Sequence, residues 1–232
     1  PACIHHTFTH ANAITCALDA GIERYDARSA LPEDECVTPI KYFPELDTYK
    51  LSVGGLRATV TGYDYNLSAG HASGGALTLV WHDSVGPVIA GSVVDYRLVE
   101  AHNQQLSLKK SRHRSLVPRV ELIRDGVRYS QCYDTRAVIT TSGNAQQISV
   151  KVHASLVTLD QAPLSSPVCV KLEYRLTDGG VGISGRVYGQ DAAQARFVLP
   201  VVADKARVEV PGACSTERIF MLTGGFDATE YT

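Results

Sequence analysis

The residues best suited to chemistry lie near the start of the chain. His5, His6 and His10 fall within six positions, and Asn12 follows two residues later. A neutral imidazole can accept a proton, an imidazolium can return it, and an amide can stabilise developing negative charge. His6 and His10 are four residues apart, so on a helix they project in the same direction and have the spacing of a metal-binding pair.

Three interpretations of these histidines stay open. No HExxH glutamate and no third ligand at a diagnostic spacing accompany His6 and His10, so we expect no metal or other cofactor, although a structural zinc is one alternative. Histidines of this kind often form only hydrogen bonds within a helix–sheet interface. The third interpretation places them along a functional cleft.

The element that must position these histidines is a helix. Ile4, Phe8, Ala11 and Leu18 recur at steps of three and four, which gives a helix over residues 1–22 one apolar stripe. Such a helix cannot bury its stripe alone. We therefore expect it to end an upstream helical domain, absent from a chain that starts without Met, or to dock on a partner chain.

The rest of the chain has the pattern of strands. Residues 23–44 carry three prolines among acidic residues and predict an irregular connection. From Tyr49 onward, about a dozen strand-like segments alternate with turn signals such as Asp125-Gly126. We expect an all-β fold, a large antiparallel β-sandwich over residues 46–232, preceded by a helical segment and linker over 1–45. The apolar segment Pro87–Val94 predicts a central strand.

A second group of polar residues lies in the least strand-like part of the β region, between Tyr96 and Ser115. The run KKSRHRS is basic, and such a run is often a solvated loop. Its arginines could instead hold a carboxylate or sulfate through paired hydrogen bonds. The candidates for substrate binding are Asn12, His102, Asn103, Arg112, His113 and Arg114.

Composition excludes several classes of function. The 22 basic and 24 acidic residues give a net charge of −2, so generic binding to nucleic acid or to a membrane surface is not expected. No apolar run approaches the roughly 18 residues that span a bilayer. The six cysteines show no CxxC pair, which disfavours a zinc ribbon, and we expect them to be mainly buried free thiols.

The segments HHTFTHANA, YDYNL and GGALTLVWHDSVGPVIAGSVVDYRLVEAHNQ resemble the C-terminal part of heparinase II/III-like polysaccharide lyases. The resemblance is clearest from His5 to Gln105. It implies a supersandwich that follows a helical toroid, and it implies periplasmic or secreted localisation. It also implies β-elimination in uronic-acid polysaccharides, with His5, His6 and His10 as catalytic candidates and Tyr96 and Tyr133 as weaker ones.

The first hypothesis for function is therefore the sandwich portion of a lyase that acts on acidic polysaccharides. The alternative is a non-catalytic carbohydrate-binding or accessory module, and a third possibility is an assembly domain whose helix docks on another chain. Saturable glycan binding by the chain alone would favour the second, whereas cleavage only with the upstream domain restored would favour the first. The sequence does not specify the glycan.

Overall fold

The computed structural model describes residues 12–16, 19, 38–62, 71–91, 94, 115–202, 219–223 and 227–231. The chain divides into two compact units, Pro1–Cys36 with Leu98–Arg112, and Val37–Arg97 with His113–Thr232. In the first unit, residues 12–16 and 19 are helical, which confirms the predicted helix at those positions. Among the described residues, no helix is long and apolar enough to cross a membrane.

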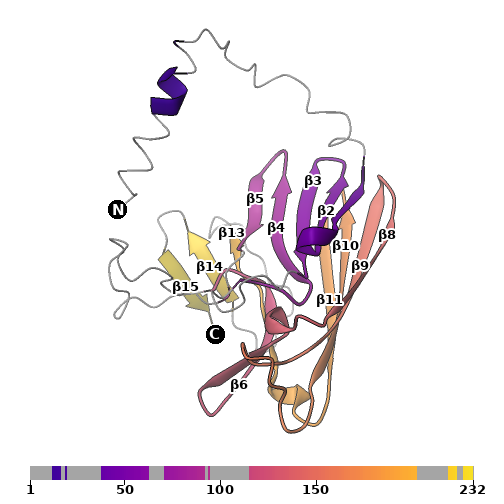
Figure 1. The fold of residues 1–232 in the computed structure, drawn as a ribbon, viewed down its shortest axis with the longest axis vertical. Helices are drawn as coiled ribbons and strands as arrows, with labels where there is room; N and C mark the ends of the chain where they lie inside the picture. Colours follow the sequence, from indigo (N-terminus) through magenta and orange to yellow (C-terminus); the bar gives the residue numbers. More distant parts are fainter. Residues whose placement is uncertain are drawn as a thin grey trace. The chain divides into compact units, whose positions relative to one another are not determined.

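The second unit begins with a five-stranded antiparallel sheet, drawn from indigo to magenta in Figure 1. Its strands follow the order of the chain: β1 (Ile40–Phe43), β2 (Thr48–Val53), β3 (Leu56–Thr61), β4 (Ala76–His82) and β5 (Gly86–Ala90). A short 3-10 turn joins β1 to β2. Short connections join β1 to β2, β2 to β3 and β4 to β5, as antiparallel neighbours allow, whereas the longer segment 62–75 joins β3 to β4.

A four-stranded antiparallel sheet follows, with the order β11-β10-β9-β8. Its strands are β8 (Val138–Gly143), β9 (Gln147–Ser155), β10 (Cys169–Thr177) and β11 (Gly180–Tyr188). Burial alternates strictly along β9 and β10, so one face of this sheet packs inward and the other faces solvent. The pattern matches the period of two expected from the sequence.

Two smaller sheets complete the described part of the unit. The first has the order β12-β6-β7, and the second has the order β13-β14-β15, in which β13 and β14 are parallel. The bounds are β6 (Arg119–Arg124), β7 (Val127–Ser130), β12 (Arg196–Val198), β13 (Val201–Val202), β14 (Ile219–Thr223) and β15 (Asp227–Tyr231).

The two larger sheets share one hydrophobic core. The inward residues of the first sheet, such as Leu51 and Val60, belong to the same buried cluster as Val152 and Leu172 of the second. The buried Tyr174 hydroxyl also donates a hydrogen bond of 3.0 Å to the Gly75 carbonyl, across from one sheet to the loop before β4. The prediction of an all-β fold built as a large antiparallel sandwich is therefore confirmed.

Two local expectations are wrong. Ile40–Phe43 lies within the predicted irregular connection but forms β1, because it pairs in register with β2. The apolar segment predicted as a central strand forms β5, which is the last strand in the order of its sheet as described. Only Ile89 of β5 is buried, and Pro87 and Ala90 are exposed, so the apolar character of this segment indicated neither burial nor a neighbour on each side. The proposed boundary between residues 45 and 46 stays a prediction.

Candidate functional site

Most of the residues selected from the sequence lie outside the described part of the chain. This applies to His5, His6, His10, His102, Asn103, Arg112, His113 and Arg114, and also to Tyr96. Asn12 is described, and it is exposed on the short helix. In the ranges that the structure describes, no group of three or more His, Cys, Asp and Glu residues could hold a metal ion.

Tyr133 and the described cysteines have definite surroundings. Tyr133, a weaker catalytic candidate, is only 2% exposed, which disfavours direct contact with a substrate. Cys132 is a buried free thiol, as predicted, whereas Cys16 and Cys169 are exposed, so the prediction of burial is wrong for these two. Cys3, Cys36 and Cys214 lie outside the described residues.

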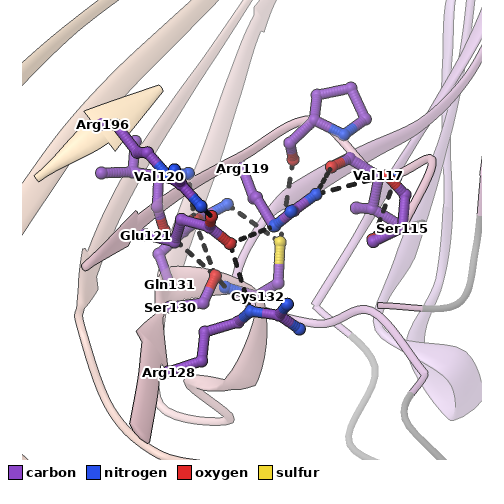
Figure 2. Close-up of polar contacts among 11 residues, drawn as sticks. Ser115, Val117, Arg119, Val120, Glu121, Arg128, Ser130, Gln131, Cys132 and Arg196 are labelled. Atoms are coloured by element: carbon purple, nitrogen blue, oxygen red, sulfur yellow. Dashed lines mark hydrogen bonds and ion pairs between the residues drawn. The ribbon is translucent and has the colours of Figure 1, made fainter. Parts of the chain in front are cut away.

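The densest group of charges in the described chain surrounds one buried carboxylate (Figure 2). Glu121 on β6 is completely buried, and three guanidinium groups reach it. Arg119 donates a hydrogen bond of 2.6 Å to Oε2, and Arg196 donates two, of 2.8 and 2.6 Å, to Oε1. Arg128 adds an ion pair of 3.3 Å to Oε2. We call these four residues the Glu121 cluster.

The structure of β6, β7 and β12 accounts for this convergence. Arg196 lies directly opposite Glu121 in the register between β12 and β6, and directly opposite residues have side chains on the same face. Arg119 is two residues before Glu121 on the same strand, so it also shares that face. Its Nη1 donates to the Val117 carbonyl at 3.1 Å.

A polar network continues from this cluster to the short 3-10 helix Gln131–Tyr133. The Val120 amide donates to Gln131 Oε1 at 2.7 Å, and Ser130 Oγ donates to the Val120 carbonyl at 3.0 Å. Cys132 Sγ donates weakly to the Pro118 carbonyl at 3.7 Å. Burial raises the pKa of the Cys132 thiol to about 12, so the sulfur stays protonated and is a poor nucleophile.

The Glu121 cluster has little capacity for acid–base chemistry. Burial would raise the pKa of Glu121, but the charges and hydrogen bonds of Arg119 and Arg196 outweigh that effect and hold the pKa below its usual value. The carboxylate is therefore ionised and cannot donate a proton near neutral pH. Both of its oxygens are already paired. We interpret the cluster as a structural link between β6, β7 and β12.

A different arrangement occupies the solvent-facing side of the four-stranded sheet. Lys171 on β10 lies directly opposite His153 on β9 and Arg186 on β11. One step further along, Glu173 lies opposite Lys151 and Ser184. These residues line an open hollow of about 300 Å³, together with Leu172 and Gly185. We call Lys151, His153, Lys171 and Arg186 the cationic face.

Two further hollows adjoin this one. A hollow of about 230 Å³ shares His153 with it and is also lined by Arg136 and Cys169. A second, of about 190 Å³, shares Leu172, Gly185 and Arg186 with it and is mostly apolar. The first of these adjoins the cationic face at β9 and β10, whereas the apolar one is lined by core-side residues such as Val170 and Leu172 together with residues of β6 and β12.

One carboxylate, Glu173, lies among these cations and interacts mainly with Arg175 and Ser149, with a weaker electrostatic effect of Lys151. Glu173 accepts hydrogen bonds from Arg175, at 3.2 and 3.5 Å, and from Ser149 at 3.0 Å. The Arg175 and Ser149 hydrogen bonds lower the pKa of Glu173. Within the described residues, Lys151, Lys171 and Arg186 form no ion pair with a carboxylate.

Sequence analysis did not select the cationic face, although a signal for it was present. The turn Asp178-Gly179-Gly180 indicates a hairpin, and its register places Lys171 opposite Arg186. The position of β9 beside β10 adds His153 and Lys151. The Glu121 cluster had no comparable signal, since Arg196 lies 75 residues beyond Glu121.

Comparison with known proteins gives a consistent result. Residues 40–219 match the family described as "Ulvan lyase C-terminal domain". A broad-specificity ulvan lyase from Formosa agariphila is 31% identical over 220 residues, which cover 90% of this chain and 34% of that protein. The chain thus spans about one third of the length of this curated relative. No solved structure matches the chain.

Proposed function

Because the chain belongs to the ulvan lyase C-terminal domain family, we propose that it is the β-sandwich part of a polysaccharide lyase that cleaves acidic, uronic-acid polysaccharides by β-elimination. The observation that carries the proposal is the family match over residues 40–219, which runs from β1 to the first residue of β14. The all-β sandwich is consistent with it. The relative's name supplies ulvan as the first substrate to test.

We also propose the organisation of heparinase II/III-like lyases, in which a helical domain precedes the sandwich. The helical residues 12–16 and 19 are consistent with the end of such a domain. The ulvan lyase from Formosa agariphila is about three times as long as the aligned segment. A protein of its length can therefore hold a helical domain in addition to the sandwich. The required partners are then the upstream domain and the polysaccharide.

The chemistry needs three groups. A cation or amide neutralises the uronic carboxylate, a base removes the proton from C5, and the electron pair forms the C4=C5 double bond as the bond from C4 to the glycosidic oxygen breaks. An acid then protonates the departing oxygen. We propose His5, His6 and His10 for the proton transfers. For carboxylate recognition we propose Asn12, His102, Asn103, Arg112, His113 and Arg114.

The test uses the protein that contains this chain together with its upstream region. Ulvan is added, and the ultraviolet absorbance of the unsaturated product is followed. Changing each of His5, His6 and His10 to Ala should reduce kcat by roughly 10²-fold or more at a catalytic position. His82→Gln is the matched control, because the His82 ring is hydrogen-bonded to Ser84 and to the Asp178 carbonyl within the sandwich.

Two results would overturn the proposal. One is the absence of any unsaturated product from the longer protein. The other is full activity in all three histidine variants, which would exclude the opening segment from the proton transfers. Binding without cleavage by the longer protein would instead favour a carbohydrate-binding or accessory module.

A further inference from the structure

We infer that the cationic face of the four-stranded sheet is a binding surface for an acidic polysaccharide chain, built from residues other than those proposed for cleavage. This inference rests on the proposed function for its choice of polymer. It concerns Lys151, His153, Lys171 and Arg186, none of which belongs to the first 22 residues or to the basic run of residues 109–115.

Positive charge is concentrated on this part of the surface. The whole chain carries a net charge of −2, so a polyanion gains nothing from the average field of the protein. Yet Lys151, Lys171 and Arg186 lie on neighbouring strands around one hollow. Glu173, the carboxylate among them, is held by Arg175 and Ser149. The local excess of positive charge is therefore available to a ligand.

Several other arginines of the chain are paired with carboxylates, unlike Arg186. Arg119 and Arg196 are both hydrogen-bonded to Glu121, and Arg124 is paired with Asp191 at 2.8 Å. This protein thus neutralises several of its guanidinium groups internally. In the described chain, Arg186 has no such carboxylate, and neither do the lysines beside it.

The basic side chains are arranged in a row with the spacing of the strands. His153, Lys171 and Arg186 form a row across three adjacent strands. Strands are about 4.8 Å apart, which is close to the length of one sugar unit along a polysaccharide. A chain lying across the strands would therefore meet a new basic side chain at about each sugar. Arg186 can hold a carboxylate with two parallel hydrogen bonds, and Lys171 supplies a point charge.

The surroundings of the row suit a sugar polymer. Tyr188 on β11 is 40% exposed, and Lys171 Nζ lies 5.5 Å from the centre of its ring, so an apolar surface adjoins the charge.

The experiment measures binding of ulvan to the 232-residue chain by calorimetry at low and at moderate salt. The test variant carries Lys151→Gln, Lys171→Gln and Arg186→Gln, and a second variant carries Lys171→Gln alone. We expect the triple variant to bind roughly tenfold more weakly or worse, because three charge-assisted contacts are lost. Added salt should weaken ulvan binding by the wild-type chain and reduce the difference in affinity between the wild-type chain and the triple variant.

The matched control is Lys41→Gln in the other sheet. Lys41 also lies over an aromatic ring, that of Phe43, at 5.4 Å. This variant removes the same charge and the same type of ring contact from a surface outside the cationic face, so it should bind ulvan as the wild-type chain does. Denaturant midpoints of all variants establish that the fold is retained.

Three results would contradict the inference, and one would support it. Equal affinity of the wild-type and triple variants, or no binding by the wild-type chain, would overturn the inference. Equal affinity of the wild-type chain for ulvan and for polyglutamate would also overturn it, because charge alone would then suffice. Selective loss of ulvan binding in the triple variant supports the inference even if the longer protein fails to cleave ulvan, an outcome that removes the lyase proposal and leaves a binding module.

Discussion

The Glu121 cluster and the cationic face use the same kinds of side chain with opposite results. In the cluster, three arginines surround one carboxylate that has no exposed surface. On the cationic face, two lysines and an arginine surround an open hollow, and the nearest carboxylate is held by Arg175. The first arrangement has few remaining contacts to offer, whereas the second has cations that form no ion pair with a carboxylate of the described residues.

This difference separates stability from recognition. A buried ion pair is costly to break, because the remaining charge is left without a partner in a medium of low polarity. An exposed, unpaired cation contributes little to folding but can gain a charge-assisted hydrogen bond when an anion arrives. Substitutions in the Glu121 cluster should therefore change the free energy of unfolding, whereas substitutions on the cationic face should change the affinity for a polyanion.

The largest effect is expected for Glu121→Gln. The substitution removes the negative charge between Arg119, Arg196 and Arg128, and it should reduce the free energy of unfolding by about 3–5 kcal/mol. Urea denaturation followed by circular dichroism measures this. An unchanged midpoint would show that the cluster does not link β6, β7 and β12 as described.

Glu173→Gln is the matched control on the cationic face. Its partner Arg175 is 64% exposed, so the solvent screens the interaction. The denaturation midpoint should stay within experimental scatter. Ulvan binding, by contrast, should strengthen, because one negative charge leaves the surface that faces the polymer.

The second comparison uses the two cysteines of these regions. Cys132 is buried beside the Glu121 cluster, and burial raises the pKa of its thiol to about 12, whereas Cys169 is exposed at the hollow next to His153. Alkylation of the native chain, mapped by mass spectrometry, should label Cys169 at least about 100-fold faster than Cys132. Comparable rates would contradict the closed structure of the cluster, and labelling in denaturant should make the two equal.

A smaller effect is expected for the pH dependence of stability at acidic pH. The pKa of Glu121 is held below 4.5, so its contribution is present above that pH and is lost as the pH falls through the folded-state value. The wild-type chain should therefore lose stability more steeply below pH 4.5 than Glu121→Gln does. Denaturation midpoints between pH 3 and 7 measure the slopes, and identical slopes would contradict the lowered pKa.

The sequence predicted the fold well where period and turns agree. The turn signal Asp125-Gly126, for example, falls between β6 and β7, which end and begin on either side of it. The prediction failed at β1, because the prolines on both sides suggested a loop, and register with β2 is a tertiary property. It failed for β5, since hydropathy does not show which strands are neighbours.

The candidate site was less accessible to sequence analysis. Alternation along β9 and β10 shows that Lys151, His153 and Lys171 face solvent, but not that they meet Arg186. That meeting depends on the pairing of three strands. The histidines near the start of the chain were selected because their types and spacing are unusual, which is a local property, and their roles stay a prediction.

The most direct test of the account is a lysine footprint of the 232-residue chain with and without ulvan. An acetylating reagent modifies exposed lysines, and mass spectrometry reports the extent at each one. We predict that ulvan at saturating concentration protects Lys151 and Lys171 roughly fivefold or more, because the bound polymer excludes the reagent, while Lys41 is unchanged. Equal protection of Lys41 and Lys171, or protection of neither, would contradict the assignment of the cationic face as the surface that receives the polysaccharide.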